Sequence, residues 1–453
     1  MKKRKAILAA VAMTITGVVA VSVAGCEWFS FTGKKNTKPV AGSLGYENSA
    51  GAWLAASVDS PRSSALDLYE EAIASGKIDP NETSFLDFLK ALHDDSASLA
   101  NSLRSAVAVI TSFGGSSLSY GSGVIYSLHE EEDVMTAYVV TNYHVVYNAG
   151  AGGDGIGKTF YTYLYGDSYD MRNLASETAI QASYVGGAME EDIAILEMQI
   201  PEDRKDFVQS VSADVGIRNS DDINAGEKVY AIGNPLGSGI SVVSGIVAVE
   251  AEYISMAKLD NADEYTEMLA MRIDAPANHG NSGGGLFDAS GKLVGIVNAG
   301  KEMTVGNQSV PVGGFGYAIP ANRALSVAQS ILDNLTANDT KAAYRGLLGT
   351  VKTVSSRGEF NQLTQSVDII ETVQIMNVDA RSPFGEDIAE RTLKSIKVTN
   401  SEGKLVISQD ILRRHQVETI LYNLRKGDTV LLVFDEGETM ATYSEDSHFI
   451  KIK

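Results

Sequence analysis

Residues of three types, far apart in the chain, could together carry out nucleophilic chemistry. Ser282 lies in the glycine-rich loop Gly280-Asn281-Ser282-Gly283-Gly284, between the apolar runs Met268–Ile273 and Lys292–Val297. Glycines beside a serine let the backbone approach a bound molecule closely, and neighbouring N–H groups can then hold a developing oxyanion. A serine hydroxyl is a weak nucleophile until a base takes its proton. The chain must therefore supply a histidine, and a carboxylate to orient it, elsewhere.

A histidine and an aspartate lie next to two apolar runs earlier in the chain. His144 follows the run Ala137–Thr141, and Asp192 precedes the run Ile193–Leu196. Taken alone, the histidine reads as a structural residue and the aspartate as a turn residue. Together with Ser282 they follow the chain order His, Asp, Ser, which is the order of the chymotrypsin-type triad.

The elements that must position these residues are mostly short strands. Runs of branched and aromatic residues, punctuated by glycine, asparagine and aspartate, begin near Ala106 and predict a β-barrel or sandwich. Asn322–Leu335 has the pattern of a helix, and Asn338–Lys341 that of a hinge. A separate small α+β unit is expected from about Tyr344, with a helix over Ser408–Leu424.

Five motifs in this order resemble the signatures of the HtrA-type serine proteases. They are Gly121-Ser122-Gly123-Val124-Ile125, Thr141-Asn142-Tyr143-His144-Val145, Glu191-Asp192-Ile193-Ala194-Ile195-Leu196, Ala231-Ile232-Gly233-Asn234-Pro235-Leu236-Gly237 and Gly280-Asn281-Ser282-Gly283-Gly284. Gly316-Tyr317-Ala318-Ile319-Pro320 resembles the segment that closes the protease domain of that family. The resemblance covers roughly residues 105–335.

The resemblance implies a mainly β chain with a chymotrypsin-like double β-barrel over residues 105–337. It assigns His144 as the base, Asp192 as the residue that orients it, and Ser282 as the nucleophile of a serine endopeptidase. Backbone N–H groups of Gly280, Asn281 and Ser282 would form the oxyanion hole. Pro276 would lie at the base of the specificity pocket, which favours small or medium aliphatic residues over lysine or arginine. No cofactor and no metal site is expected.

The last unit, residues 344–453, resembles a small α+β PDZ-like domain. In that family the stretch Gly346, Leu347, Leu348 and Gly349 would hold a peptide C-terminus through backbone N–H groups, while the peptide adds a strand. The usual Gly-Asp pair before the strand Leu393–Val398 is replaced here by Arg391-Thr392.

The chain begins with a targeting segment. A basic start and the apolar run Ala6–Val21 lead to Val23-Ala24-Gly25-Cys26, which resembles a bacterial lipobox. We expect a signal peptide over 1–25, lipidation at Cys26, a tether over 26–62 and short helices over 63–104. The chain would then be anchored to the bacterial cell membrane by lipid and face the extracytoplasmic side. An uncleaved transmembrane anchor is the alternative interpretation.

Composition limits the partners. The chain has 57 acidic and 37 basic residues, a net charge of −20, so nucleic acid is not an expected partner. The resemblance implies unfolded or damaged polypeptides as substrates, and a homotrimer as the assembly. The alternative is a surface lipoprotein with a latent catalytic site that acts as a peptide-binding or chaperone-like module.

Two other motifs match by letters alone. Gly152–Thr159 fits the phosphate-binding loop pattern, but the strand-like Phe160–Tyr165 follows where that motif needs a helix. Gly280–Gly284 fits the G-x-S-x-G elbow, but Leu286–Val297 is expected to form two strands with a turn, not a helix.

Overall fold

The computed structural model describes residues 98–168, 173–305, 308–338, 341–362 and 366–452, together with residues 70, 73, 74 and 79. The chain divides into two compact units, residues 1–90 and 91–453, and every element named below belongs to the second. The expected signal peptide, Cys26 and the tether lie outside the described residues, as does most of the segment 63–104, whose end forms α6 (Ala100–Ser105). No helix among the described residues combines the length and apolar character that crossing a membrane requires.

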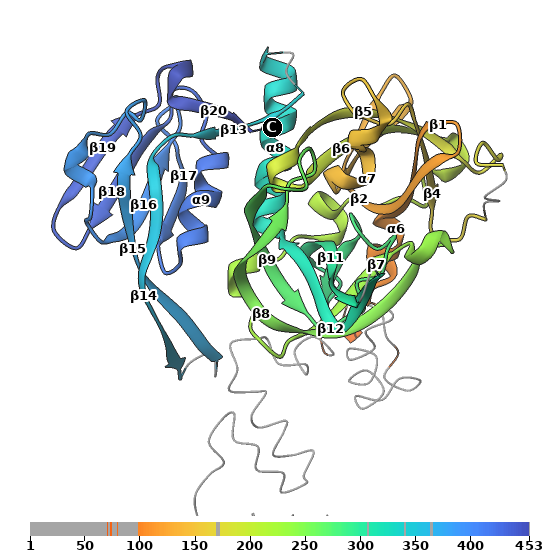
Figure 1. The fold of residues 1–453 in the computed structure, drawn as a ribbon, viewed down its shortest axis with the longest axis horizontal. Helices are drawn as coiled ribbons and strands as arrows, with labels where there is room; N and C mark the ends of the chain where they lie inside the picture. Colours follow the sequence, from red (N-terminus) through yellow and green to blue (C-terminus); the bar gives the residue numbers. More distant parts are fainter. Residues whose placement is uncertain are drawn as a thin grey trace, which may run out of the picture. The chain divides into compact units, whose positions relative to one another are not determined.

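Two closed barrels of six strands each make up the larger part of this unit, on the right in Figure 1. The first has the strand order β1-β2-β3-β6-β5-β4 and the second β10-β11-β12-β9-β8-β7. All neighbouring strands are antiparallel. The first barrel contains β1 (Ala106–Gly114), β2 (Ser117–Glu131), β3 (Val134–Thr141), β4 (Thr159–Leu164), β5 (Ile180–Ala188) and β6 (Ile193–Ile200). The second contains β7 (Lys228–Gly233), β8 (Ser241–Ala257), β9 (Tyr265–Ile273), β10 (Gly285–Asp288), β11 (Leu293–Val305) and β12 (Gln308–Pro320).

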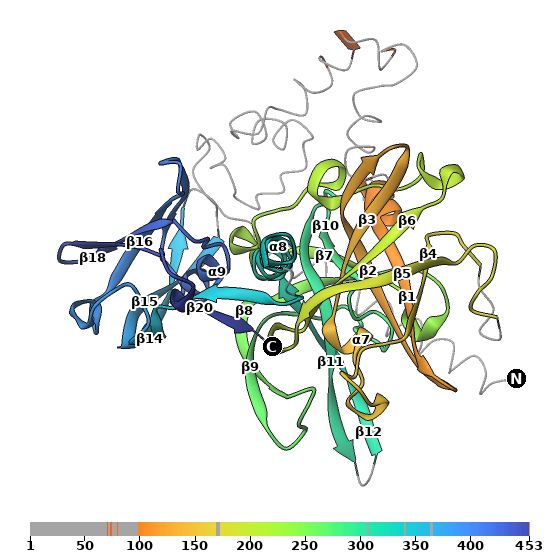
Figure 2. The same cartoon turned by 90° about the horizontal axis from the view of Figure 1, so that it is seen from above.

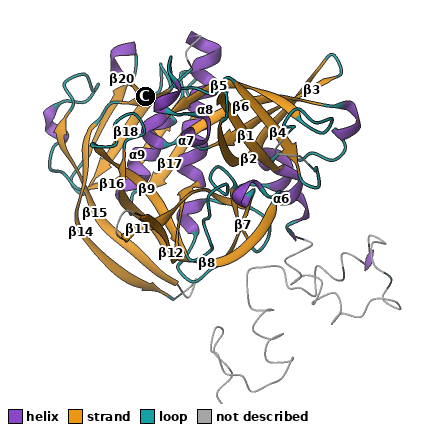
Figure 3. Cartoon of the chain, turned by 45° about the vertical axis from the view of Figure 1, so that its right-hand side comes forward, coloured by secondary structure: helices purple, strands orange, loops and turns teal. Residues whose placement is uncertain are grey.

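The alternation of side chains along each strand builds separate cores. In β1, Val107 and Val109 belong to the core of the first barrel, whereas Ala108 and Ile110 pack with Tyr163 on the opposite face. A further cluster joins residues of both barrels to the helix α8 (Ala321–Asn338). The prediction of a mainly β chain with a double barrel is confirmed, and strands dominate the described chain in Figure 3.

The C-terminal unit begins after α8. Its strands are β13 (Ala343–Gly346), β14 (Gly349–Asn361), β15 (Ser366–Val378), β16 (Leu393–Thr399), β17 (Leu405–Asp410), β18 (Thr429–Phe434), β19 (Glu438–Thr442) and β20 (Phe449–Ile452). They form the hairpin β14-β15, the pair β13-β20 and the sheet β17-β16-β18-β19, accompanied by the helix α9 (Arg414–Tyr422). In Figure 2, α8 is seen nearly end-on, and it contacts β5, β6 and β11 of the barrels as well as β13 and α9.

Two expectations about local structure are confirmed and one is wrong in part. Thr159–Leu164 is the strand β4, and two strands, β10 and β11, follow the serine loop, so neither motif that matched by letters alone leads into a helix. The helix expected over Ser408–Leu424 begins only at Arg414. Residues Leu405–Asp410 instead form β17, because they pair with β16. The PDZ resemblance of this unit stays a prediction.

Candidate functional site

The candidate base and the candidate orienting carboxylate lie on neighbouring elements of the first barrel. His144 is in α7 (Tyr143–Val146), the single turn that follows β3, and Asp192 lies just before β6. Nδ1 of His144 is 2.7 Å from Oδ2 of Asp192, and the backbone N–H of His144 donates to Oδ1 at 2.8 Å. Because a carboxylate can only accept, Nδ1 carries the ring proton, and Nε2 is left as the basic nitrogen.

Asp192 has a left-handed backbone conformation, with φ 51° and ψ 42°, which is uncommon for a residue other than glycine. Its carbonyl accepts from Nδ2 of Asn142 at 2.9 Å and from the N–H of Tyr143 at 3.2 Å, and its own N–H donates to Met189. These bonds, with the two to His144, hold the carboxylate in one place despite the unfavourable dihedral angles.

Opposing effects act on the pKa of His144. Burial lowers this pKa, whereas the negative charge of Asp192 and the hydrogen bond to its carboxylate raise it, and the net result is a pKa above the ordinary value of 6.5. The side chain of His144 remains about a third exposed, so the ring can be reached from outside. A base whose pKa is raised needs a correspondingly higher pH to be neutral.

Ser282 comes from the second barrel, in the loop between β9 and β10. Its hydroxyl donates to the backbone carbonyl of Asn298 at 2.6 Å. Among the described residues, no hydrogen bond joins Ser282 to His144. The hydroxyl must therefore leave the Asn298 carbonyl before Nε2 of His144 can take its proton.

Asn298, on β11, is a site residue that the sequence reasoning missed. Its Nδ2 donates to Oδ2 of Asp192 at 2.5 Å, and its side chain is buried, with Oδ1 lacking a hydrogen-bond partner among the residues that the structure describes. One residue thus contacts both the candidate nucleophile and the candidate carboxylate. The available signal was a polar residue placed directly after the apolar run that ends at Val297.

Hydrogen bonds of the serine-loop backbone set the direction of its N–H groups. The carbonyl of His279 accepts from the N–H of Leu236 at 2.7 Å, and a trans peptide places the N–H of Gly280 on the opposite side. Gly280 has φ 96°, a conformation that favours glycine. No hydrogen bond is recorded for the N–H groups of Gly280 and Ser282 in the described part of the chain, and both are available to an oxyanion.

Asn281, between these two donors, ties the loop to the expected specificity pocket. Its carbonyl accepts from the N–H of Gly284 at 2.9 Å, and its Nδ2 donates to the carbonyl of Pro276 at 3.1 Å. The Asn281 N–H donates to the carbonyl of Asn278, so this N–H is not free for an oxyanion. Pro276 itself follows β9, on the approach to the serine loop.

Comparisons with known proteins find relatives of this part of the chain. Residues 121–296 match the family model described as a trypsin-like peptidase domain. The chain contains a trypsin-like peptidase domain, and it is similar to serine proteases of the HtrA type. The periplasmic pH-dependent serine endoprotease DegQ of Escherichia coli (strain K12) is 31% identical over 242 residues, which are 53% of this chain and 43% of that relative. The serine protease Do-like HtrA of Lactococcus lactis subsp. cremoris (strain MG1363) is 27% identical over 328 residues, 72% of this chain and 69% of that relative.

The match to DegQ thus spans less than half the length of that relative. A solved structure of the HtrA-type protease AlgW with tripeptide is 22% identical, with a TM-score of 0.43, covering 78% of this chain and 96% of that one. Within the described residues, no group of three or more His, Cys, Asp or Glu side chains is arranged to hold a metal ion near the protease site or elsewhere.

The predicted peptide-binding stretch of the C-terminal unit lines a cavity of about 390 Å³. Gly346, Leu347, Leu348 and Gly349 line it together with Arg414, Glu418 and Leu421 of α9. The N–H of Leu347 already donates to the carbonyl of His448 at 2.8 Å, and the Leu347 carbonyl accepts from the hydroxyl of Tyr443. No hydrogen bond is recorded for the N–H of Leu348 among the described residues.

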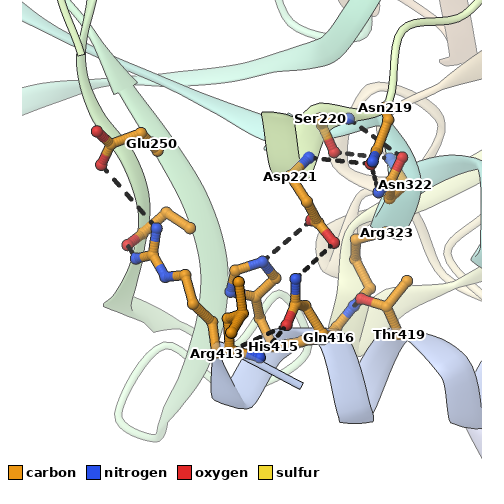
Figure 4. A network of polar contacts seen from close by, with 12 residues as sticks. Asn219, Ser220, Asp221, Glu250, Asn322, Arg323, Arg413, His415, Gln416 and Thr419 are labelled. Carbon is orange, nitrogen blue, oxygen red and sulfur yellow. Dashed lines mark hydrogen bonds and ion pairs between the residues drawn. The ribbon is translucent and has the colours of Figure 1, made fainter. Parts of the chain in front are cut away.

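A buried arginine links the protease domain to α9. Arg323, in α8, is only 3% exposed, and its Nη1 lies 3.2 Å from both carboxylate oxygens of Glu191. Its Nε donates to Oγ1 of Thr419 at 3.0 Å, a contact seen in Figure 4, and its Nη2 lies 3.3 Å from Glu418. The hydroxyl of Tyr422 also donates to Glu191 at 2.7 Å. Because Glu191 immediately precedes Asp192, this network ends next to the candidate carboxylate.

A second set of polar contacts lies at the start of α9. Nε2 of His415 is 3.1 Å from Asp221 of the protease domain, and Nε2 of Gln416 donates to the same carboxylate at 3.2 Å (Figure 4). Arg413 points toward Glu250 of β8, with 4.0 Å between the charged groups. Carboxylates of the protease domain thus face basic and amide side chains of the helix.

Proposed function

We propose that the chain is an extracytoplasmic serine endopeptidase that hydrolyses peptide bonds of unfolded or damaged proteins. The observation that carries the proposal is the pairing of His144 with Asp192 beside a serine loop in which two N–H groups have no hydrogen-bond partner among the described residues. A base, a group that fixes its tautomer, a nucleophile and oxyanion donors are the parts that acyl transfer requires. The trypsin-like family match over residues 121–296 supports the same reaction class.

In the proposed reaction, the Ser282 hydroxyl turns from the Asn298 carbonyl to Nε2 of His144. As Oγ bonds to the substrate carbonyl carbon, its proton passes to Nε2 and an electron pair moves onto the carbonyl oxygen. Asp192 stabilises the imidazolium, and the N–H groups of Gly280 and Ser282 bind the oxyanion. Collapse expels the amine, which takes the proton from Nε2, and water then hydrolyses the acyl-enzyme by the same steps.

The proposed location follows the sequence and the relatives. DegQ is named as a periplasmic protease, and this chain begins with a basic and apolar segment that ends in Gly25-Cys26. We extend the proposal to a lipid anchor at Cys26 on the extracytoplasmic face of the bacterial cell membrane, and to a homotrimer as the assembly.

Replacing Ser282 by Ala tests the proposed activity. The full-length chain should cleave casein and react with a fluorophosphonate probe, and Ser282→Ala should lose both signals, because Oγ forms the covalent bond in each case. The readouts are gel electrophoresis of the digest and mass spectrometry of the labelled peptide. Folded wild-type protein that neither cleaves nor labels would refute the endopeptidase and favour the latent, peptide-binding lipoprotein.

A second proposed function is capture of a peptide C-terminus by Gly346–Gly349. The cavity beside α9 and the N–H of Leu348 support it. A peptide with an apolar C-terminal residue should bind, and its C-terminal amide should bind at least about tenfold more weakly, because a charged acceptor makes the stronger hydrogen bonds. Fluorescence anisotropy of the two peptides measures this difference. Equal affinity for acid and amide would rule out carboxylate capture.

A further inference from the structure

A buried serine of the first barrel makes four hydrogen bonds, two of them to the serine loop of the second barrel. Ser122, on β2, has 0% of its surface exposed. Its hydroxyl donates to the carbonyl of Gly280 at 2.6 Å and accepts from the N–H of Asn234 at 2.7 Å. Its backbone N–H donates to the carbonyl of Ser282 at 2.8 Å, and its own carbonyl accepts from Oγ1 of Thr141 at 2.6 Å.

These bonds involve Gly280 and Ser282, whose N–H groups have no hydrogen-bond partner within the described ranges. The carbonyls of Gly280 and Ser282 are both held by Ser122, one through the hydroxyl and one through the backbone. Fixing a carbonyl fixes the plane of its peptide unit, since the amide group is rigid. The peptide unit that carries the Ser282 N–H therefore lies between two units that Ser122 holds, and the unit that carries the Gly280 N–H is followed by one of them. Ser122 lies more than 150 positions away in the sequence.

The hydroxyl also connects the loop to a second segment that orients it. Asn234 begins the turn that contains Leu236, whose N–H holds the His279 carbonyl and so directs the N–H of Gly280. Leu236 has φ 55° and ψ 22°, an unfavourable conformation for leucine, and it is 71% exposed, so few contacts of its side chain stabilise the turn. The bond from Asn234 to Ser122 anchors the start of this turn.

Close packing around the hydroxyl leaves no substitute for it. A Cβ placed on Gly233 would lie 2.9 Å from Oγ of Ser122, and one on Gly284 would lie 3.2 Å from its Cβ. A Cβ on Gly280 would lie 2.2 Å from the carbonyl oxygen of Asn234. The space freed by removing one hydroxyl is smaller than the roughly 30 Å³ that a water molecule occupies in the liquid. The Gly280 carbonyl and the Asn234 N–H would then lose their partner unless the loop moved.

We infer that Ser122 is a positioning residue that holds the oxyanion donors of the serine loop in their receptive orientation. This inference rests on the proposed endopeptidase function. Ser122 touches no reacting atom. It acts by restraining the Gly280 and Ser282 peptide units from the other barrel. Removing it should impair stabilisation of the tetrahedral intermediate without changing the base.

The test compares Ser122→Ala with the matched control Ser330→Ala in the full-length chain. Ser330 is also 0% exposed, and its hydroxyl likewise donates to a backbone carbonyl and accepts from a backbone N–H, both of Tyr344. Ser122→Ala should lower kcat/KM by about 10- to 100-fold. Complete loss of one oxyanion donor lowers the rate by about 10²–10³-fold, and here the donors are displaced and not removed. KM should stay within about threefold of wild type, and a peptidyl boronic acid should bind more weakly by the same factor as the loss of kcat.

Two further readouts separate positioning from general stability. The acid limb of the pH profile should not move, because the bonds between His144 and Asp192 are untouched, and Ser330→Ala should keep wild-type kcat/KM. Amide hydrogen exchange over residues 276–288 should accelerate in Ser122→Ala and not in Ser330→Ala, a result that supports positioning even if wild-type protein proves to be no peptidase. Unchanged kcat/KM in Ser122→Ala, or loop exchange that accelerates equally in both variants, would overturn the inference.

Discussion

Asp192→Asn is expected to lower kcat/KM for peptide hydrolysis by about 10⁴-fold, the effect of this exchange in other Ser-His-Asp triads. Oδ2 of Asp192 accepts from Nδ1 of His144 and from Nδ2 of Asn298, and Oδ1 accepts from the backbone N–H of His144. An asparagine offers one acceptor oxygen in place of two. An NH₂ group at the Oδ2 position would face two donors and would force the imidazole proton onto Nε2, where the ring can no longer act as the base. An NH₂ group at the Oδ1 position would oppose the His144 N–H.

The pH dependence provides a second measurement on the same variant. In wild-type protein the pKa of His144 lies above 6.5 because the effects of Asp192 exceed the lowering by burial. Since the neutral ring is the active form, kcat/KM should rise with pH through this raised pKa. In Asp192→Asn the raising effects of the charge are gone, so the acid limb of the residual activity should move to lower pH.

Glu190→Gln is the matched control, because Glu190 is an exposed carboxylate in the same turn. It should keep kcat/KM within about threefold of wild type, as surface charges have small effects. Initial rates from pH 5 to 9 with a fluorogenic peptide measure both variants. Activity of Asp192→Asn within tenfold of wild type would mean that Asp192 does not orient the base.

Much of the fold and of the candidate site could be predicted because the relevant signals are local. His144 lies just after one apolar run, and Asp192 lies just before another. The glycines around Ser282 indicate a tight loop. Short-range patterns of this kind determine strands and turns directly. They identify the element that carries each residue but leave barrel and sandwich open, and the double barrel was expected only from the family resemblance.

The contacts that the sequence could not predict depend on strand register and on distant partners. Asn298 meets Asp192 over a separation of 106 residues, and Ser122 meets Gly280 over 158. No local pattern distinguishes these residues from other buried polar side chains. A contact of Leu347 in the C-terminal unit likewise depends on a partner that is distant in the sequence. Its N–H donates to His448 because β20 returns to pair with β13, which the motif alone did not indicate.

Arg323→Met is expected to destabilise the fold by about 3–5 kcal/mol, the range for breaking a buried ion pair from one side. Arg323 and Glu191 are 3% and 13% exposed, and removal of the guanidinium would leave Glu191 with the Tyr422 hydroxyl as its one partner in the described part of the chain. Glu418 would keep its hydrogen bond from Tyr253 and its ion pair with Arg414. Urea unfolding followed by circular dichroism and tyrosine fluorescence measures the loss, since buried tyrosines such as Tyr422 lie in the folded unit. Arg357→Met, which removes an exposed arginine from its pair with Glu359, should change stability by less than about 0.5 kcal/mol.

A double-mutant cycle shows whether Arg323→Met destabilises the fold by leaving a buried carboxylate unpaired or by removing packing. Glu191→Gln should destabilise the wild-type protein but stabilise the Arg323→Met background, because there it removes an unpaired buried carboxylate. If Glu191→Gln were destabilising in both backgrounds, buried charge would not be the cause of the loss.

At acidic pH, the free energies of unfolding of wild type and Arg323→Met should become more similar. Burial raises the pKa of Glu418, but the charge of Arg323 and the hydrogen bond from Tyr253 outweigh this, and the net pKa lies below the ordinary 4.5. A carboxyl whose folded-state pKa is lowered contributes stability above its unfolded-state pKa, and this contribution is lost as the pH falls through the folded-state value. The free energy of unfolding should therefore fall more steeply in wild type than in Arg323→Met below about pH 4.5. The guanidinium of Arg323 also lies over the ring of Tyr422, 5.5 Å from its centroid. Parallel curves from pH 7 to pH 3 would mean that Arg323 stabilises the contact with α9 through this packing and not through its charge.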